Sequence, residues 1–412
     1  MADQTAGMVP RIRFRAYTES WAEEKIGDVL AEKRRPIVLE DDQRYELITV
    51  KRRNEGVVSR GHLLGRDILV KNYAQLKAGD FVISKRQVVH GATGIVPPAL
   101  DGAIVSNEYL TAVDSEKLLT EFLTIVASLP AMRRKFFLSS YGVDIEKLFF
   151  DADDWKKRSV MLPDVQEQGR IGQFFRKLDQ LITLHQRKHE KLLALKVAML
   201  QKMFPQLGAS IPEIRYKGFS APWDSIALGK LGQPYSGIFG KTKEDFGSGD
   251  ARFVTYMGVF SNAICDPNAT EAIGVDKSQN EVKKGDVMFT ISSETSDEVG
   301  MSSVWPGDEE NIYLNSFCFG FRPLPSLRSE FLAYVLRANA FRARVCVLAQ
   351  GISRYNISKS KVMNIPISVP TEKEQESIGA YFCSLDTLIE KHRNQIQKLR
   401  QIKSACLEEM FV

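Results

Sequence analysis

The sequence PDVQEQGRIGQFFRKLDQLI at residues 163–182 returns as PTEKEQESIGAYFCSLDTLI at residues 370–389, and this repeat decides the fold. An internal repeat this close means that both halves of the chain share one design. The residues that recur 207 positions later are Pro163, Glu167, Gln168, Ile171, Gly172, Phe175, Leu178, Asp179, Leu181, Ile182, His185, Leu192, Met203 and Phe204.

Weaker matches extend the repeat through the parts that precede these two tails. They pair Trp21 with Trp223, Gly79-Asp80 with Gly285-Asp286, and Glu121-Phe122-Leu123 with Glu330-Phe331-Leu332. Their spacing drifts by a few residues, which indicates small loop insertions. Each half therefore consists of a variable globular part followed by a nearly constant tail.

The tails have the pattern of long helices. A proline and acidic residues open each one, as helix starts prefer, and apolar residues then recur on a heptad. Two such helices most simply pack on each other, although each could instead pack on its own globular part. The predicted seam residues are Ile171, Leu178, Leu181, His185 and Leu192 in the first tail and Ile378, Leu385, Leu388, His392 and Leu399 in the second.

The direction of the predicted helix pair can be tested at named positions. In an antiparallel pair Ile171 approaches Leu399, and Met199 approaches Ile378. His185 and His392 lie near the two helix midpoints, so we expect their rings to be close together, with at least one of them neutral at pH 7. The alternative is that the apolar stripe rotates and leaves both histidines solvated.

The globular parts have the pattern of a mixed α/β fold. Strands are predicted at 45–50 and 81–84, with counterparts at 253–256 and 287–291. Helices are predicted at 118–129 and 327–338, and a Gly-, Pro- and Ser-containing stretch at 208–212 links the halves.

Composition excludes several classes of protein. Of 412 residues, 44% are hydrophobic and 26% charged, as in ordinary globular proteins. No apolar run reaches the roughly 18 residues of a membrane helix, and the start lacks the pattern of a secretory signal. The five cysteines form no Cys-x-x-Cys pair, which is typical of reduced thiols. We therefore expect a soluble, cytoplasmic, multidomain protein, and its net charge of +5 permits nucleic-acid binding without arguing for it.

Motifs for catalysis or metal binding are weak. Gly240-Lys241-Thr242 ends like a Walker loop, but Tyr235 stands where that motif needs glycine. The Gly-rich residues 246–250 lack a preceding apolar strand, so we interpret them as a surface loop. His185 and His189 lie one turn apart without a third ligand, which favours a polar layer of a coiled coil over zinc. We predict no catalytic residues and no metal.

Basic loops beside polar residues are the remaining candidates for function. Arginine and lysine neutralise phosphates, and several polar side chains can read base edges. Each cluster alone is typical of a solvated surface, but their repetition in both halves favours DNA binding. The candidate DNA-binding residues are Lys51, Arg52, Arg53, Lys85, Arg86, His90 and Thr93 in the first half and Ser292, Ser293, Thr295, Arg354 and Tyr355 in the second. Further basic residues stand at 133–135, 156–158, 337, 342, 344, 359 and 361.

Over essentially its full length the chain resembles the specificity subunit of type I restriction–modification systems. The twin tails carry the resemblance, together with Trp21, Trp223, the two Gly-Asp pairs and the stretch 351–358 that leads into Ile365-Pro366. Residues 142–148 depart from it, because they are more acidic than the counterpart at 351–354. That departure makes DNA contacts by 142–148 doubtful.

The resemblance implies two pseudo-symmetric α/β target-recognition domains, residues 1–160 and 208–367, that each read half of a split DNA site. It implies two spacer helices, 161–207 and 368–412, that form an antiparallel coiled coil and set the gap between half-sites. Two methyltransferase subunits would dock on the helices, and motor-nuclease subunits would join for cleavage. S-adenosylmethionine, ATP and Mg²⁺ would belong to those partners, with no cofactor on this chain.

Two other functions stay open at this point. A coiled-coil adaptor would join proteins without touching DNA, and salt-dependent binding to duplex DNA would separate it from a DNA reader. A fused restriction–methylation enzyme would need methyltransferase motifs that the chain does not show. The recognition loops differ between the halves, 87–91 against 292–296, so we expect two different half-sites.

Overall fold

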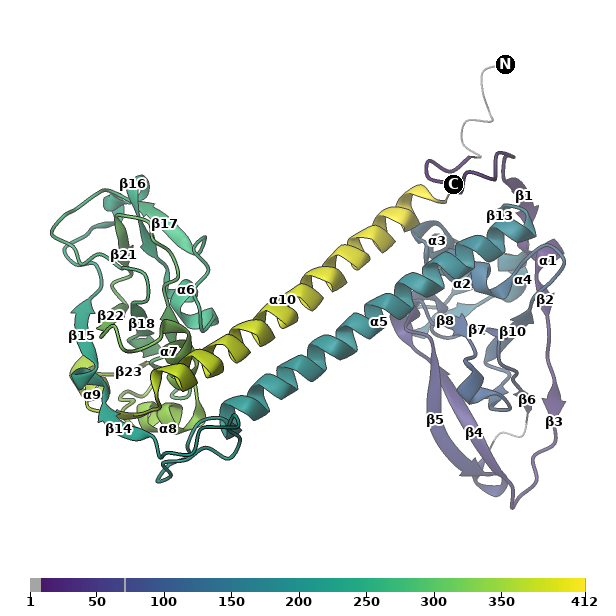
Figure 1. The fold of residues 1–412 in the computed structure, drawn as a ribbon. Helices are drawn as coiled ribbons and strands as arrows, with labels where there is room; N and C mark the ends of the chain where they lie inside the picture. The colour runs from purple at the N-terminus through teal and green to yellow at the C-terminus, as the bar shows by residue number, and fades with distance from the viewer. Residues whose placement is uncertain (1–8, 70–71, 412) are drawn as a thin grey trace. The chain divides into compact units, whose positions relative to one another are not determined.

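The computed structural model describes residues 9–69 and 72–411 (Figure 1). The chain divides into two compact units. Unit 1 runs to Leu184 and also includes the chain from Gln395 onward, and unit 2 runs from His185 to Asn394. Both units are mixtures of helices and short strands, so the α/β class predicted from the sequence is confirmed. Each unit is described by itself.

Unit 1 contains a four-stranded sheet of order β2-β10-β7-β8 and a five-stranded sheet of order β3-β6-β9-β4-β5. The predicted strands at 45–50 and 81–84 are β4 and β7, and the predicted helix at 118–129 is α2. The elements are β1 (Ala22–Lys25), α1 (Ile26–Val29), β2 (Ala31–Glu32), β3 (Pro36–Ile37), β4 (Arg44–Val50), β5 (Val57–Leu64), β6 (Tyr73–Gln75), β7 (Phe81–Ser84), β8 (Thr93–Ile95), β9 (Ile104–Ser106), β10 (Tyr109–Val113), α2 (Thr120–Ser128), α3 (Pro130–Leu138), β11 (Ser140–Tyr141), β12 (Phe149–Phe150), α4 (Ala152–Lys156) and β13 (Ser159–Leu162).

Unit 2 repeats this plan with a four-stranded sheet of order β15-β22-β18-β20 and a three-stranded sheet of order β17-β16-β21. Residues 246–250, interpreted from sequence as a loop, are the exposed first half of β16, which pairs with β17 through a bulge. The elements are β14 (Asp224–Ala227), β15 (Gly232–Ser236), β16 (Phe246–Val254), α6 (Tyr256–Ser261), β17 (Thr270–Ile273), β18 (Val287–Thr290), β19 (Ser292–Ser293), β20 (Ser302–Val304), β21 (Ile312–Leu314), β22 (Cys318–Pro323), α7 (Ser329–Val335), α8 (Asn339–Val347), β23 (Tyr355–Asn356), α9 (Lys359–Met363) and β24 (Pro366–Val369).

The same pairings recur at matching places in the two units. β1 is antiparallel to β13 in unit 1, and β14 is antiparallel to β24 in unit 2. β4 is parallel to β9, as β16 is parallel to β21. The repeat seen in the sequence is therefore a repeat of topology as well.

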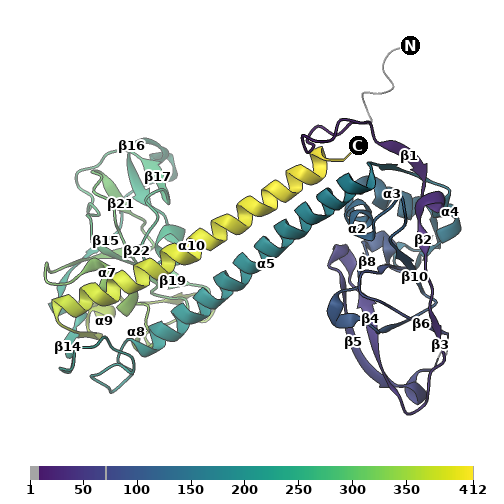
Figure 2. The same ribbon diagram turned by 45° about the vertical axis from the view of Figure 1, so that its right-hand side comes forward.

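The two tails form the long helices α5 (Val165–Lys202) and α10 (Glu372–Glu409). Both start four residues later than the expected spacer segments, because the intervening residues end the strands β13 and β24. Figures 1 and 2 show α5 and α10 side by side. Within each unit they run antiparallel. Leu399 packs with the core that holds Ile171 in unit 1, and Met199 packs with the core that holds Ile378 in unit 2.

Two ion pairs join the helices at equivalent places. Lys403 pairs with Asp179 in unit 1 at 2.5 Å, and Lys196 pairs with Asp386 in unit 2 at the same distance. Each pair joins an early residue of one helix to a late residue of the other. This order is the one expected of an antiparallel pair.

The heptad predicted from the sequence has the right period but its buried edge is shifted. Ile171, Leu178, Ile378 and Leu385 are buried, whereas Leu181 and Leu388 are 43% and 44% exposed. Phe175 and Phe382, which directly follow the partly buried Phe174 and Tyr381, are also buried. The exposure of Leu181 and Leu388 shows that they do not belong to the seam, contrary to the prediction. The cause is that the first half of each helix packs on the globular part of its own repeat. The helices contact each other and their globular parts together.

Each core is completed by a phenylalanine that follows the helix of the other repeat. In unit 1 the ring of Phe411 lies 5.9 Å from those of Trp21 and Phe122. In unit 2 the ring of Phe204 lies 6.0 Å from Phe331 and stacks on Phe382 at 5.7 Å. These contacts explain why the Met-Phe pair ends both copies of the tail.

The Glu-Gln pair of each tail joins helix and globular part. Glu167 accepts two hydrogen bonds from Arg13, both of 2.7 Å, and its side chain is 1% exposed. The Gln168 amide accepts a hydrogen bond from the Leu119 backbone and donates to the backbone carbonyl of Lys117. Glu374 and Gln375 repeat this arrangement with Arg215 and the backbone N–H of Arg328.

Gly172 and Gly379 are glycines because another element lies against them. A Cβ at Gly172 would stand 2.8 Å from the Glu121 side chain, and one at Gly379 would stand 2.7 Å from that of Glu330. Real Cβ contacts are longer than this, so α2 and α7 can approach the helices only at glycine. The Ile-Gly and Glu-Phe-Leu repeats are therefore two sides of one contact.

Candidate nucleic-acid interface

Three separate loops of unit 1 meet around Arg52. Arg52 lies in a single turn, η1 (Arg52–Asn54), directly after β4. Its guanidinium donates to Gln87 at 2.8 Å and to Glu146 at 2.7 Å, and Glu146 also lies 3.6 Å from the His90 ring. The candidate residues that follow β4 and β7 therefore come together.

The conformation of this turn is fixed by the residue beside the basic run. Arg53 and Asn54 both have left-handed backbone angles, with φ of 60° and 57°. Asn54 donates to the Thr93 hydroxyl at 2.9 Å and accepts from Arg133 at 3.0 Å. An asparagine tolerates this backbone and holds the turn through its side chain. Asn54 was missed in the sequence, although its place next to three basic residues was a usable signal.

The remaining candidates of unit 1 have different surroundings. Thr93 is only 1% exposed, so it supports Asn54 and offers no atom to a ligand, contrary to expectation. Lys85 donates to the Asn107 carbonyl at 3.0 Å. Arg86 pairs with Glu108 at 2.6 Å and lies over the Phe149 ring. The side chains of Lys51 and Arg53 remain exposed and have no partner among the described residues.

The acidic segment 142–148 contacts the candidate loops through Glu146. Glu146 neutralises Arg52 and faces His90, while Val143 and Ile145 are exposed beside it. The segment therefore sets the charge of the site, which was not expected from its sequence.

In unit 2 the candidate residues come together through one strand pair. β19 and β23 are antiparallel, with Ser292 opposite Asn356 and Ser293 opposite Tyr355. Ser292 and Ser293 are buried, so their predicted DNA contacts are not available at the surface. Thr295 and Arg354 are exposed, and the Arg354 guanidinium lies 5.8 Å from the exposed Phe317 ring.

Three arginines of the second half are structural, contrary to the basic cluster expected there. Arg337 donates to the carbonyls of Ser302, Phe260 and Asn262, and burial lowers its pKa to about 10. Arg342 donates to carbonyls at 297, 299 and 300. Arg344 donates to Pro366. Their guanidinium groups donate hydrogen bonds to backbone carbonyls that would otherwise be unpaired.

Comparison with known proteins gives one decisive match. Residues 18–194 and 222–401 both match the family model of the type I restriction modification DNA specificity domain. The chain belongs to this family. The resemblance identified from the twin tails is thereby confirmed.

A solved structure of a type I S subunit shares the fold of this specificity-domain chain. The S subunit of the type I restriction-modification system from M. genitalium is 12% identical, covers 98% of this chain and 99% of its own, and superposes with a TM-score of 0.53. The HsdS subunit from Thermoanaerobacter tengcongensis is 18% identical and has a TM-score of 0.48. The match covers 95% of this chain and 96% of the HsdS chain. At such identity the first likeness establishes the fold alone.

Membrane-spanning helices and metal clusters are absent from the described residues. Within residues 9–69 and 72–411, no helix is long and apolar enough to cross a membrane. In the same ranges, no three His, Cys, Asp or Glu side chains gather closely enough to hold a metal ion. All five cysteines are free.

The two histidines expected near the helix midpoints are in contact. The Nδ1 atoms of His185 and His392 lie 2.8 Å apart, and their ring centroids 5.0 Å apart. A hydrogen bond at this distance needs one donor and one acceptor, so at most one of the two rings is charged. Burial lowers the pKa of His392, and the charges of His185, Lys188, Lys391 and His189 add to this effect.

This pair predicts a dependence of stability on pH. Because the folded-state pKa of His392 is lowered from 6.5, its neutral form stabilises the fold above pH 6.5. That stability is lost as the pH falls through 6.5 towards the lower folded pKa. We expect the loss of melting temperature between pH 8 and pH 5.5 to be smaller in His392→Asn than in the parent. His62→Gln, at an exposed histidine, serves as the control, and parallel curves for all three proteins would contradict the prediction.

Proposed function

We propose that this chain is the non-catalytic DNA-recognition subunit of a type I restriction–modification complex. Each unit would read one half of a bipartite duplex target through the loops described above. The observation that carries the proposal is that one architecture occurs twice, with the exposed basic loops Lys51–Arg53 in unit 1 and the exposed Arg354 in unit 2. Two different loops of this kind suit two different half-sites.

The helix pair would serve the partners. Leu181 and Leu388 leave part of α5 and α10 apolar and exposed at equivalent positions, as expected of a surface that two identical subunits use. We propose that two methyltransferase subunits dock there and that motor-nuclease subunits join for cleavage. S-adenosylmethionine, ATP and Mg²⁺ would then be bound by the partners, in the cytoplasm.

Exchange of one unit tests the reading of half-sites. Residues 20–160 are replaced by those of a relative with a different target, and the chain is co-expressed with a methyltransferase subunit of the same system. Mapping of methylated bases should show one half-site changed and the other retained. A change in both half-sites would mean that the units share a single recognition surface.

Lengthening the helices tests their proposed role in spacing. One heptad inserted into both α5 and α10 adds about 10 Å at 1.5 Å per residue, or roughly three base pairs. We expect the gap between the methylated half-sites to grow by this amount while the bases read stay the same. If the gap stays constant, the helices do not set the spacing.

A coiled-coil adaptor that does not touch DNA is the competing function. The full chain with its methyltransferase should bind duplex DNA with an affinity that falls steeply with salt, because phosphate contacts release counterions. Co-purification of the two proteins without such binding would favour the adaptor.

A further inference from the structure

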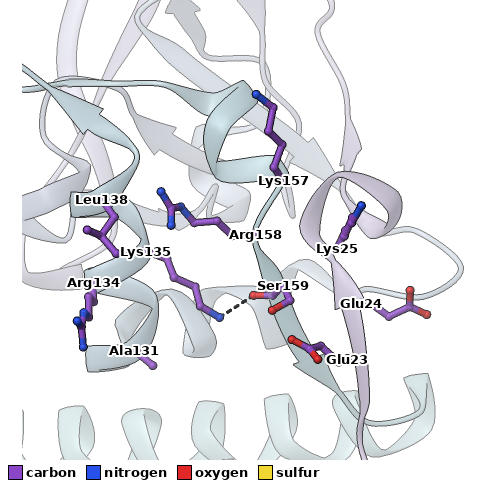
Figure 3. A pocket seen from close by; sticks show the side chains of 10 residues that line it. All are labelled: Glu23, Glu24, Lys25, Ala131, Arg134, Lys135, Leu138, Lys157, Arg158 and Ser159. Carbon is purple, nitrogen blue, oxygen red and sulfur yellow. Dashed lines mark hydrogen bonds between the residues drawn. The ribbon is translucent and has the colours of Figure 1, made fainter.

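A pocket lined by cations lies in unit 1 between α3 and the paired strands β1 and β13 (Figure 3). Its volume is about 850 Å³. Lys135 and Arg158 reach into the space between helix and strand, and three further basic side chains stand at its rim. The charged lining residues are Glu23, Glu24, Lys25, Arg134, Lys135, Lys157 and Arg158.

Most of this positive charge is not used by the fold. Within the described residues, the side chains of Lys25, Arg134 and Lys157 have no hydrogen-bond or ion-pair partner. The Lys135 ammonium is half-buried and donates to the Ser159 carbonyl at 2.6 Å, which leaves two of its three donors free. Burial lowers the pKa of Lys135, so an anion in the pocket would stabilise its charged form. Glu24 is already paired with Lys117 at 2.8 Å.

The equivalent place in unit 2 has the same backbone plan without most of these cations. There Arg344 donates to the Pro366 carbonyl at 2.6 Å, as Lys135 does to Ser159. The cavity beside Arg344 and Pro366, which Phe204 and Pro205 also line, has a volume of only about 20 Å³. The second repeat has no cation at four of these positions. Ala227 stands in place of Lys25, Ala343 in place of Arg134, Asn364 in place of Lys157 and Ile365 in place of Arg158. The same fold is thus built with a small site that keeps one cation, Arg344, in unit 2 and with an open site lined by five cations in unit 1.

We propose that this pocket binds phosphate groups of the DNA backbone that flank the bases read by unit 1, an inference that rests on the proposed function. The pocket and the candidate interface share α3. Arg133 of this helix contacts Asn54 at the interface, while the next two residues, Arg134 and Lys135, line the pocket. A duplex held by the loops around Arg52 would therefore continue over a cationic surface. Such contacts add affinity without sequence information.

The test replaces the three unpaired cations with the residues that the second repeat already carries. The variant Lys25→Ala, Arg134→Ala, Lys157→Asn leaves Lys135 and Arg158 in place, since both have hydrogen-bond partners in the fold. The matched control removes three exposed cations from the long helices, Arg170→Ala, Lys177→Ala and Lys398→Ala. Binding of the full chain to a duplex of arbitrary sequence is measured by fluorescence anisotropy over a series of salt concentrations, and melting curves confirm that both variants fold.

We expect the pocket variant to lower the salt slope, d log K/d log[salt], by about one for each phosphate that the protein no longer neutralises. Its affinity near 0.1 M salt should fall roughly 10- to 100-fold, and the control should change neither quantity. An unchanged slope in the pocket variant, or an equal change in the control, would overturn the inference while leaving the proposed function intact. The inference would also be overturned if the pocket variant bound DNA like the parent but failed to co-purify the methyltransferase, because the pocket would then hold an acidic protein segment. If the parent chain shows no salt-dependent binding to duplex DNA either alone or together with its methyltransferase, the proposed function itself fails.

Discussion

Replacement of Glu374 by alanine should destabilise unit 2 by about 3–5 kcal/mol. The Glu374 side chain is fully buried and accepts hydrogen bonds of 2.7 and 2.8 Å from Arg215, which is itself 12% exposed. Removal of the carboxylate leaves a nearly buried guanidinium without its counter-charge, and this costs far more than the pair contributes. Urea unfolding of the full chain measures the effect as a lower midpoint.

The neighbouring Glu372→Ala is the matched control. Glu372 pairs with Arg328 at 3.0 Å on the same helical turn, but 52% and 41% of the two side chains are exposed. An exposed pair contributes at most about 1 kcal/mol, so this variant should unfold close to the parent. The double variant Arg215→Met, Glu374→Leu removes both charges and should regain most of the lost stability. Equal effects of Glu372→Ala and Glu374→Ala would show that burial of the ion pair does not matter.

The elements that could be predicted from the sequence are those whose pattern lies within one continuous segment. β4, β7, α2 and the two long helices have clear periods and helix-start signals, and the repeat marks each of them twice. The histidine contact followed from the positions of the helix midpoints, whereas the antiparallel direction was implied by the resemblance to type I specificity subunits. These predictions needed no knowledge of distant partners.

The errors arose where a distant partner decides burial. The heptad of α5 offered Phe174-Phe175 and Leu181-Ile182 at two adjacent edges, and only the sheets and α2 determine that the edge with Phe175 and Ile182 is covered. Thr93 is buried by a turn some forty residues earlier, and Ser292 by a strand beyond residue 350. Arg337 was assigned to the surface by its charge, although carbonyls about 35 and 75 residues away satisfy it.

The phenylalanine that follows each long helix should be essential to the core that it enters. Phe204→Ala should destabilise unit 2 by about 3–5 kcal/mol, as for other buried phenylalanines. The ring is 2% exposed and lies among Trp223, Phe331 and Phe382. Its removal leaves a cavity that neighbouring rings cannot fill. Conservative replacement by leucine should cost less than half of this.

Phe411→Ala is the matched variant of unit 1. The Phe411 ring lies among Trp21, Phe122 and Phe175 but is only half-buried, so we expect roughly half the effect of Phe204→Ala. Hydrogen exchange of the full chain locates each effect. Phe204→Ala should accelerate exchange around Trp223, and Phe411→Ala around Trp21, because each ring completes a core whose other members belong to the opposite repeat. Faster exchange confined to the helix that precedes the substituted residue would contradict this account, since the phenylalanine would then stabilise its own helix and not the core.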